Sequence, residues 1–139
     1  MKANNQPPPT WTPFLRARMD RLIDLCREHH LRRLWLFGSV LREADFRPDS
    51  DVDVLFELDR PSIRDEAYLS NLYGFRDELE KLFGRRIDMV HYPSLKNPYF
   101  IEEIDETKQL VYDQVASGRL LTPQRKYVGN QSKMGIIVQ

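Results

Sequence analysis

The sequence predicts an α/β (α+β) domain in which a small mixed β-sheet is flanked by helices. Three observations predict this class. Short apolar runs of strand length alternate with amphipathic helical patterns, glycine or proline stands at many of the boundaries, and no internal repeat is visible. The expected order is helix, strand, short helix, strand, long helix, strand, helix and short strand.

Three stretches carry the apolar period of a helix packed against a core. The first is expected to begin at Thr12 and Pro13, because a capping hydroxyl followed by proline is typical of a first turn. The second ends at Gly84, and the third lies within residues 97–108. The residues expected to face the core are Leu15, Met19, Leu22 and Cys26 in the first helix, Tyr68, Leu69, Leu72, Phe75, Leu79, Leu82 and Phe83 in the second, and Phe100, Ile101 and Ile104 in the third.

Four apolar runs have the length of strands. They span residues 32–38, 51–58, 85–91 and 109–113. A short helix is expected to begin at Ser39, and "RPDS" at residues 47–50 is typical of a turn. Trp35 stands in the middle of the first run, where a core position is expected rather than a base-stacking surface.

A chain of 139 residues is most simply one domain. We expect a flexible proline-rich arm at residues 1–11, one folded domain at 12–114 and a tail at 115–139. The tail has basic residues and no acidic ones, so it is either a plain extension or a segment that docks onto a partner.

The composition limits which classes of partner and which cellular compartment are expected for this protein. Lys and Arg total 21, as do Asp and Glu, and this zero net charge argues against direct nucleic-acid binding or an anionic membrane surface. Cys26 is the single cysteine, which excludes an internal disulfide and favours a reducing compartment. No apolar stretch is long enough to cross a bilayer, and the N-terminus lacks a secretory apolar region. A cytoplasmic, soluble protein is expected.

Carboxylates are concentrated in the second and third predicted strands. Residues two apart in a strand face the same side, so Asp51 and Asp53 project together, while Asp88 lies inside "RIDMV". If the two strands pair, three carboxylates converge, and each charge raises the pKa of the others. A divalent cation removes that conflict, and Mg²⁺ prefers such oxygen ligands together with substrate phosphates. Two ions at such a site stabilise both the attacking and the leaving oxygen of a displacement.

A Gly-Ser pair follows the first strand. Gly38 lets the main chain approach a ligand, the Ser39 hydroxyl can donate to a phosphate, and Arg42 can reach the same anion. Taken singly, a Gly-Ser pair is a common turn and an Asp-x-Asp pair is a common solvated loop. The combination of strand, Gly-Ser, Asp-x-Asp strand and a later strand with an internal aspartate favours a metal-dependent phosphate site.

The segment "FGSVLREADFRPDSDVDVLFEL", together with "RRIDMV", resembles the DNA polymerase beta-like nucleotidyltransferase superfamily. It is most similar to the minimal nucleotidyltransferases (MNT) that pair with HEPN-domain ribonucleases in prokaryotic toxin–antitoxin modules. The resemblance covers residues 12–113. It implies nucleotide binding by Gly38, Ser39 and Arg42. Glu43 departs from the pattern, because many relatives have glycine after the arginine.

The resemblance also implies a metal triad of Asp51, Asp53 and Asp88 and a reaction. Asp51 and Asp53 would bind two Mg²⁺ ions, and Asp88 would hold the ion that activates the acceptor and would take its proton. AMP would pass from ATP to a hydroxyl, with release of pyrophosphate. In the antitoxin branch the acceptor is a tyrosine of the HEPN toxin, whose RNase activity is silenced.

Other residues and other functions remain open at this stage. His91, Tyr92 and Tyr99 are weaker candidates for contact with nucleotide or acceptor. The acceptor is alternatively a small molecule or an RNA, although such enzymes usually carry an additional domain. A third possibility is a non-catalytic antitoxin that masks its toxin by binding, against which the three retained carboxylates count.

Overall fold

A computed structural model describes residues 10–115 of the chain. Most of the expected arm and nearly all of the expected tail lie outside the described residues. The elements, in chain order, are α2 (Pro13–Arg16), α3 (Met19–Glu28), β1 (Leu31–Phe37), η1 (Gly38–Leu41), β2 (Val52–Leu58), η2 (Arg60–Ser62), η3 (Asp65–Ala67), α4 (Tyr68–Phe83), β3 (Ile87–His91), η4 (Tyr92–Ser94), α5 (Pro98–Thr107) and β4 (Gln109–Asp113). This order confirms the expected succession of longer helices and strands.

The four strands form one sheet in the order β3-β2-β1-β4. β1 pairs antiparallel with both β2 and β4, whereas β2 and β3 run parallel. The sheet is therefore mixed, as the sequence predicted. β3 and β4 are its edges within the described part of the chain.

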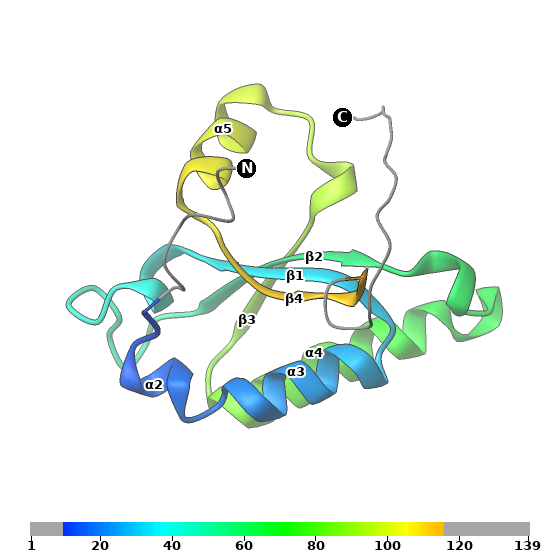
Figure 1. The fold of residues 1–139 in the computed structure, drawn as a ribbon, viewed down its shortest axis with the longest axis horizontal. Coiled ribbons are helices and arrows are strands. Elements are labelled where there is room, and N and C mark those ends of the chain that lie inside the picture. Colours follow the sequence, from blue (N-terminus) through cyan, green and yellow to red (C-terminus); the bar gives the residue numbers. More distant parts are fainter. Residues whose placement is uncertain (1–9, 116–139) are drawn as a thin grey trace.

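Helices cover both faces of the sheet (Figure 1). α3 and α4 lie on one face and α5 lies on the other. The main core is on the α3–α4 face, where Leu22 and Phe75 meet alternate β2 residues such as Val54. A smaller cluster on the opposite face joins Trp35, Leu55 and Ile104. Trp35 and Cys26 are buried, which confirms their expected core positions.

α4 ends as its sequence predicts. Gly84 adopts φ 66°, and its N–H donates to the carbonyl of Glu80 at 2.8 Å. This left-handed turn is the usual helix terminator that glycine permits. The predicted apolar face is too wide at its start, however, because Leu69 is 58% exposed.

The first predicted helix is divided in two. Thr12 caps α2 by accepting a hydrogen bond from the Leu15 N–H at 3.3 Å, which confirms the predicted start. The chain then breaks before α3, at Arg18, whose guanidinium donates to the carbonyls of Phe14 at 2.9 Å and Leu82 at 3.0 Å. These contacts join the break to the end of α4, and no local pattern in the sequence encodes such a distant partner.

The short helix expected from Ser39 is a single 3₁₀ turn, η1, that begins at Gly38. The expected helix is therefore shorter and more tightly wound than a regular α-helix. Among residues 10–115, no helix combines the length and the apolarity needed to cross a membrane.

Candidate active site

The register of β2 and β3 brings two of the predicted carboxylates together. Asp53 pairs directly with Asp88 across the parallel strands. Both side chains lie on the face that carries Leu55 and Val90, because alternate residues of each strand share a face. Asp53 also lies opposite Phe37, the last residue of β1, so the pair stands just beyond the point where β1 turns into η1.

The electrostatic environment of Asp53 opposes its ionisation. Burial, the nearby charges of Asp88 and then Asp51, and a hydrogen bond with Asp88 together raise its pKa to about 6, and burial is the largest of these causes. Two carboxylates that share a site in this way oppose each other's ionisation, so one of them retains its proton more tightly. A divalent cation at the pair would replace that proton.

The third carboxylate is nearby but turned aside. Asp51 directly precedes β2, and its Oδ2 atom lies 3.6 Å from Nη2 of Arg86. Both side chains are well exposed, so this ion pair is weak. Within residues 10–115 no three His, Cys, Asp or Glu side chains are placed to hold a metal ion. The described geometry thus assembles Asp53 with Asp88, and Asp51 would join them by leaving Arg86.

Gly38 lies against the Asp53 carboxylate. It adopts φ +79°, and a Cβ atom added there would clash with Oδ2 of Asp53. Only glycine lets the main chain of the β1–η1 turn come this close to the carboxylate. The structure thus shows close approach of Gly38 to Asp53, whereas its approach to a ligand stays a prediction.

Ser39 and Arg42 lie at the two ends of the same turn. The Arg42 N–H donates to the Ser39 carbonyl at 2.9 Å, which closes η1. The Arg42 guanidinium donates from Nε to Asp45 at 2.5 Å while its side chain remains 55% exposed. Sequence analysis missed Asp45, although an acidic residue three positions after an arginine is a recognisable pairing signal.

The donor set suits a hard divalent cation. Asp53 and Asp88 offer carboxylate oxygens at one point of the sheet, and Gly38 keeps side-chain atoms out of the space beside them. Carboxylates of this kind bind Mg²⁺ while leaving positions for water and phosphate oxygens. Asp53 and Asp88 therefore fit the kind of metal that the sequence suggested, whereas Asp51 would have to leave Arg86 to become a further ligand.

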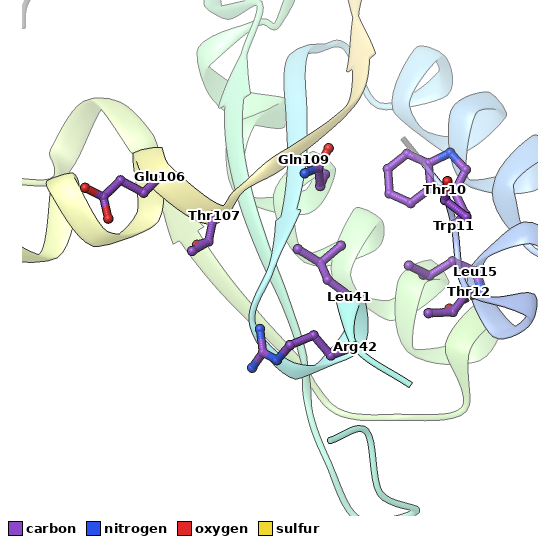
Figure 2. A pocket seen from close by; sticks show the side chains of 9 residues that line it. All are labelled: Thr10, Trp11, Thr12, Leu15, Leu41, Arg42, Glu106, Thr107 and Gln109. Atoms are coloured by element: carbon purple, nitrogen blue, oxygen red, sulfur yellow. Dashed lines mark hydrogen bonds between the residues drawn. The ribbon is translucent and has the colours of Figure 1, made fainter. Parts of the chain in front are cut away.

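A cavity of about 330 Å³ adjoins the Gly-Ser turn (Figure 2). Its lining includes Leu41 at the end of η1, Arg42 directly after it, Trp11 and Leu15 from the start of the described chain, and Gln109 from β4. The cavity lies on the β4 side of η1, away from Asp88.

A second hollow of about 380 Å³ lies along the β3 edge and includes Asp88 and His91. His91 contacts Ser94 Oγ through Nδ1 at 2.6 Å, and burial lowers its pKa. Tyr92 instead packs on Trp35 with ring centroids 5.0 Å apart, and its hydroxyl donates to Asp105 at 3.2 Å. Tyr99 is 81% exposed. Of the three weaker candidates, His91 is thus the one that shares a hollow with Asp88.

Comparison with known families gives one match, which covers most of the described chain. Residues 19–111 match the family model described as "Nucleotidyltransferase domain". Two proteins of Methanocaldococcus jannaschii, each named "putative protein adenylyltransferase", are similar over this region. The first is 31% identical over 61% of this chain and 79% of its own length, and the second is 28% identical over 63% and 82%.

Solved structures share the fold. One described as a "putative minimal nucleotidyltransferase" superposes with a TM-score of 0.54 at 32% identity and covers 68% of this chain and 90% of its own. A second, described as a toxin–antitoxin with AMP-PNP, superposes with a TM-score of 0.51 at 18% identity, covering 68% and 73%. At that identity the second likeness concerns the fold alone.

Proposed function

Since this chain belongs to the nucleotidyltransferase domain family, we propose that it transfers AMP from ATP to a tyrosine hydroxyl of a partner protein. The partner we propose is a HEPN-domain RNase toxin, so that the chain acts as its antitoxin. Three features of similar proteins support this proposal: the names of the two archaeal relatives, the toxin–antitoxin description of one structural neighbour and the AMP-PNP in that description.

The observation that carries the proposal is the joining of two sequence motifs at one point. The Gly38 turn lies against Asp53, and Asp53 pairs with Asp88. A phosphate-binding turn and a pair of metal-binding carboxylates are the two requirements for displacement at a nucleotide phosphorus. Separately, each motif has ordinary structural explanations. In contact, they are best explained by a bound nucleotide.

Each residue then has a defined task. Asp51, Asp53 and Asp88 would hold two Mg²⁺ ions, which supply charge neutralisation for the phosphates and lower the pKa of the acceptor hydroxyl. Ser39 and the Gly38 turn would bind the β- and γ-phosphates, and Arg42 would exchange Asp45 for a phosphate. The tyrosine oxygen forms a bond to the α-phosphorus, the bond from that phosphorus to the bridging oxygen breaks, and pyrophosphate leaves. Asp88 would accept the hydroxyl proton.

The experiment that tests this proposal is a mass measurement. The neighbouring-gene protein, or a purified HEPN toxin, is incubated with the full chain, ATP and Mg²⁺, and its intact mass is recorded. We expect one or more adenylate additions on tyrosine, absent with Asp53→Asn. Lys81→Glu is the matched control, because Lys81 is an exposed residue of α4 whose partner is Glu78.

The outcomes separate the alternatives. Adenylate on the toxin that persists in Asp53→Asn would exclude the proposed carboxylate site. Nucleotide binding without any adenylylated protein would indicate that the acceptor is a small molecule or an RNA. Inhibition of the toxin without nucleotide binding or adenylate would leave a masking antitoxin as the better description.

A further inference from the structure

The hollow beside Asp88 lies where an acceptor must arrive. It runs between α4 and the edge strand β3, and its lining includes Leu72, Tyr73 and Arg76 from α4 and Asp88, Met89 and His91 from β3. If Asp88 takes the acceptor proton, the acceptor hydroxyl comes to this edge of the sheet. The hollow thus adjoins Asp88 at the sheet edge, on the face opposite to the one that carries the Asp53 and Asp88 side chains.

The edge of β3 presents main-chain groups outward. The Val52 N–H donates to the Arg86 carbonyl at 2.9 Å, and Val52 pairs with Ile87. In a parallel ladder of this register, Asp88 directs its main-chain groups toward β2, whereas Ile87 and Met89 direct theirs away. Such an edge is a template for one further strand.

The two faces of such an added strand would meet different surroundings. Asp88 projects to the face of Asp53, while Met89 and His91 project to the α4 face and line the hollow. Side chains of an extended segment alternate in the same way. A residue opposite Asp88 would place its side chain near that carboxylate, and its sequence neighbours would enter the hollow.

The hollow also has a defined chemistry. Tyr73 is 50% exposed, and Leu72 and Met89 add apolar surface to the lining of the hollow. The Arg76 guanidinium lies 5.2 Å from the centre of the Tyr73 ring, and within residues 10–115 it forms no ion pair. An occupant with an apolar side chain and a carboxylate is therefore favoured.

We propose that the acceptor polypeptide binds as an additional strand on the β3 edge, with its tyrosine on the Asp88 face. One neighbouring side chain, apolar, fills the hollow, and the other, acidic, pairs with Arg76. This inference rests on the proposed function and adds to it the mode of acceptor recognition. It also implies that the acceptor tyrosine lies in a segment of the partner that is extended already or that unfolds to become extended on binding.

The probes are blocked peptides of about seven residues, the length of an ordinary strand. Each has a central tyrosine flanked by leucine and glutamate, in both orders because the direction of the added strand is open. There are two reference probes. The first is the same set of peptides with the main-chain nitrogen beside the tyrosine methylated. The second is N-acetyltyrosinamide, which has no flanking residues. Peptide affinity is measured by fluorescence anisotropy without ATP, and AMP transfer is measured by mass with ATP and Mg²⁺.

We expect the unmodified peptides to bind and to accept AMP with a higher kcat/KM than N-acetyltyrosinamide, and N-methylation to abolish the gain. Arg76→Glu should weaken binding by roughly threefold to tenfold, in keeping with one exposed ion pair. A peptide with lysine in place of glutamate should recover that loss in Arg76→Glu. Lys81→Glu makes the same charge change outside the hollow and should leave peptide affinity as in the original chain.

Three results would overturn the docking mode. These are peptides no better than N-acetyltyrosinamide, insensitivity to N-methylation, and failure of all peptides to bind. Binding of Mg²⁺–ATP is measured in parallel to separate the two levels of the proposal. If, with one of these results, nucleotide still binds and N-acetyltyrosinamide is still modified, only the proposed docking mode is wrong and the proposed function stands. If nucleotide does not bind, the proposed function fails as well.

Discussion

The close approach of Gly38 to Asp53 makes this glycine difficult to replace. Its φ of +79° strains any other residue, and an added Cβ would also meet the Asp53 carboxylate. We expect Gly38→Ala to lower the free energy of unfolding by about 2–4 kcal/mol, the sum of strain and overpacking. Urea denaturation measures this directly.

Gly84 provides the matched comparison. It also has a positive φ, +66°, but an added Cβ there has nothing within 4 Å. Gly84→Ala should therefore cost only the conformational strain, about 1–2 kcal/mol. Equal losses of unfolding free energy in the two variants would show that the Asp53 side chain moves aside without an energetic penalty. The contact between Gly38 and Asp53 would then not contribute to stability.

Asp53 should make the metal-free fold sensitive to pH. Its pKa is about 6 in the fold, against 3.8 as its usual value, so the folded state binds the proton more tightly than the unfolded chain. The protonated form therefore contributes stability at low pH, and this contribution is lost as pH rises through about 6. Asp53→Asn, which carries no charge, should be more stable than the original chain at pH 7.

The size and the pH window of this effect are both testable. The raised pKa corresponds to about 1–3 kcal/mol after allowance for partial solvent exposure. The advantage of Asp53→Asn should be largest above pH 6 and should shrink as pH falls toward 4. Denaturation in a chelating buffer across this range measures it, and an advantage that grows on acidification would contradict the assigned sign.

At the scale of elements, α5 depends on its N-cap residue, Asn97, for its position over the sheet. The Asn97 side-chain oxygen accepts from the N–H of Tyr99 at 2.9 Å and of Phe100 at 3.3 Å. The helix places Ile104 against Trp35 and Leu55. Asn97→Ala should cost about 1 kcal/mol, whereas Asn97→Asp, which retains the acceptor, should cost little. Thermal unfolding of both variants distinguishes capping from a general effect of substitution.

Elements defined by local signals were predictable from sequence. The Thr12–Pro13 start and the Gly84 end are capping signals, and both are confirmed. The break at Arg18 was not predictable, because it depends on the Leu82 carbonyl, 64 residues away. Sequence also misjudged η1, where the contact of Gly38 with Asp53 is accompanied by a tight turn rather than a regular helix.

The candidate site divides in the same way. The alternation of residues in strands predicts that Asp53 and Asp88 share a face once their strands pair, and the β2–β3 register bears this out. Asp51 lies outside the strand, so its side chain is not fixed by that alternation. Its direction toward Arg86 is set by a tertiary ion pair that no local pattern reveals.

At the scale of the whole molecule, binding of metal and nucleotide should be visible as stability. A ligand that binds only the folded state adds free energy by mass action, about 2.7 kcal/mol at one hundred times its dissociation constant. At an unfolding entropy of about 2.1 cal/mol/K per residue, that corresponds to a rise in Tm of roughly 9–12 °C for a domain of this size. We expect this rise with Mg²⁺ and AMP-PNP together, and a much smaller rise with Asp53→Asn.

The same measurement at two pH values connects the stability of the molecule to its site. Asp53 must lose its proton to bind a cation. Because its pKa is about 6, the Asp53 carboxyl is protonated in most molecules at pH 5. The rise in Tm should therefore be smaller at pH 5 than at pH 7.5. Lys81→Glu should behave as the original chain at both values. An equal rise at both pH values in the original chain would mean that nucleotide binds without the Asp53 carboxylate, and the cation would then have to be placed elsewhere.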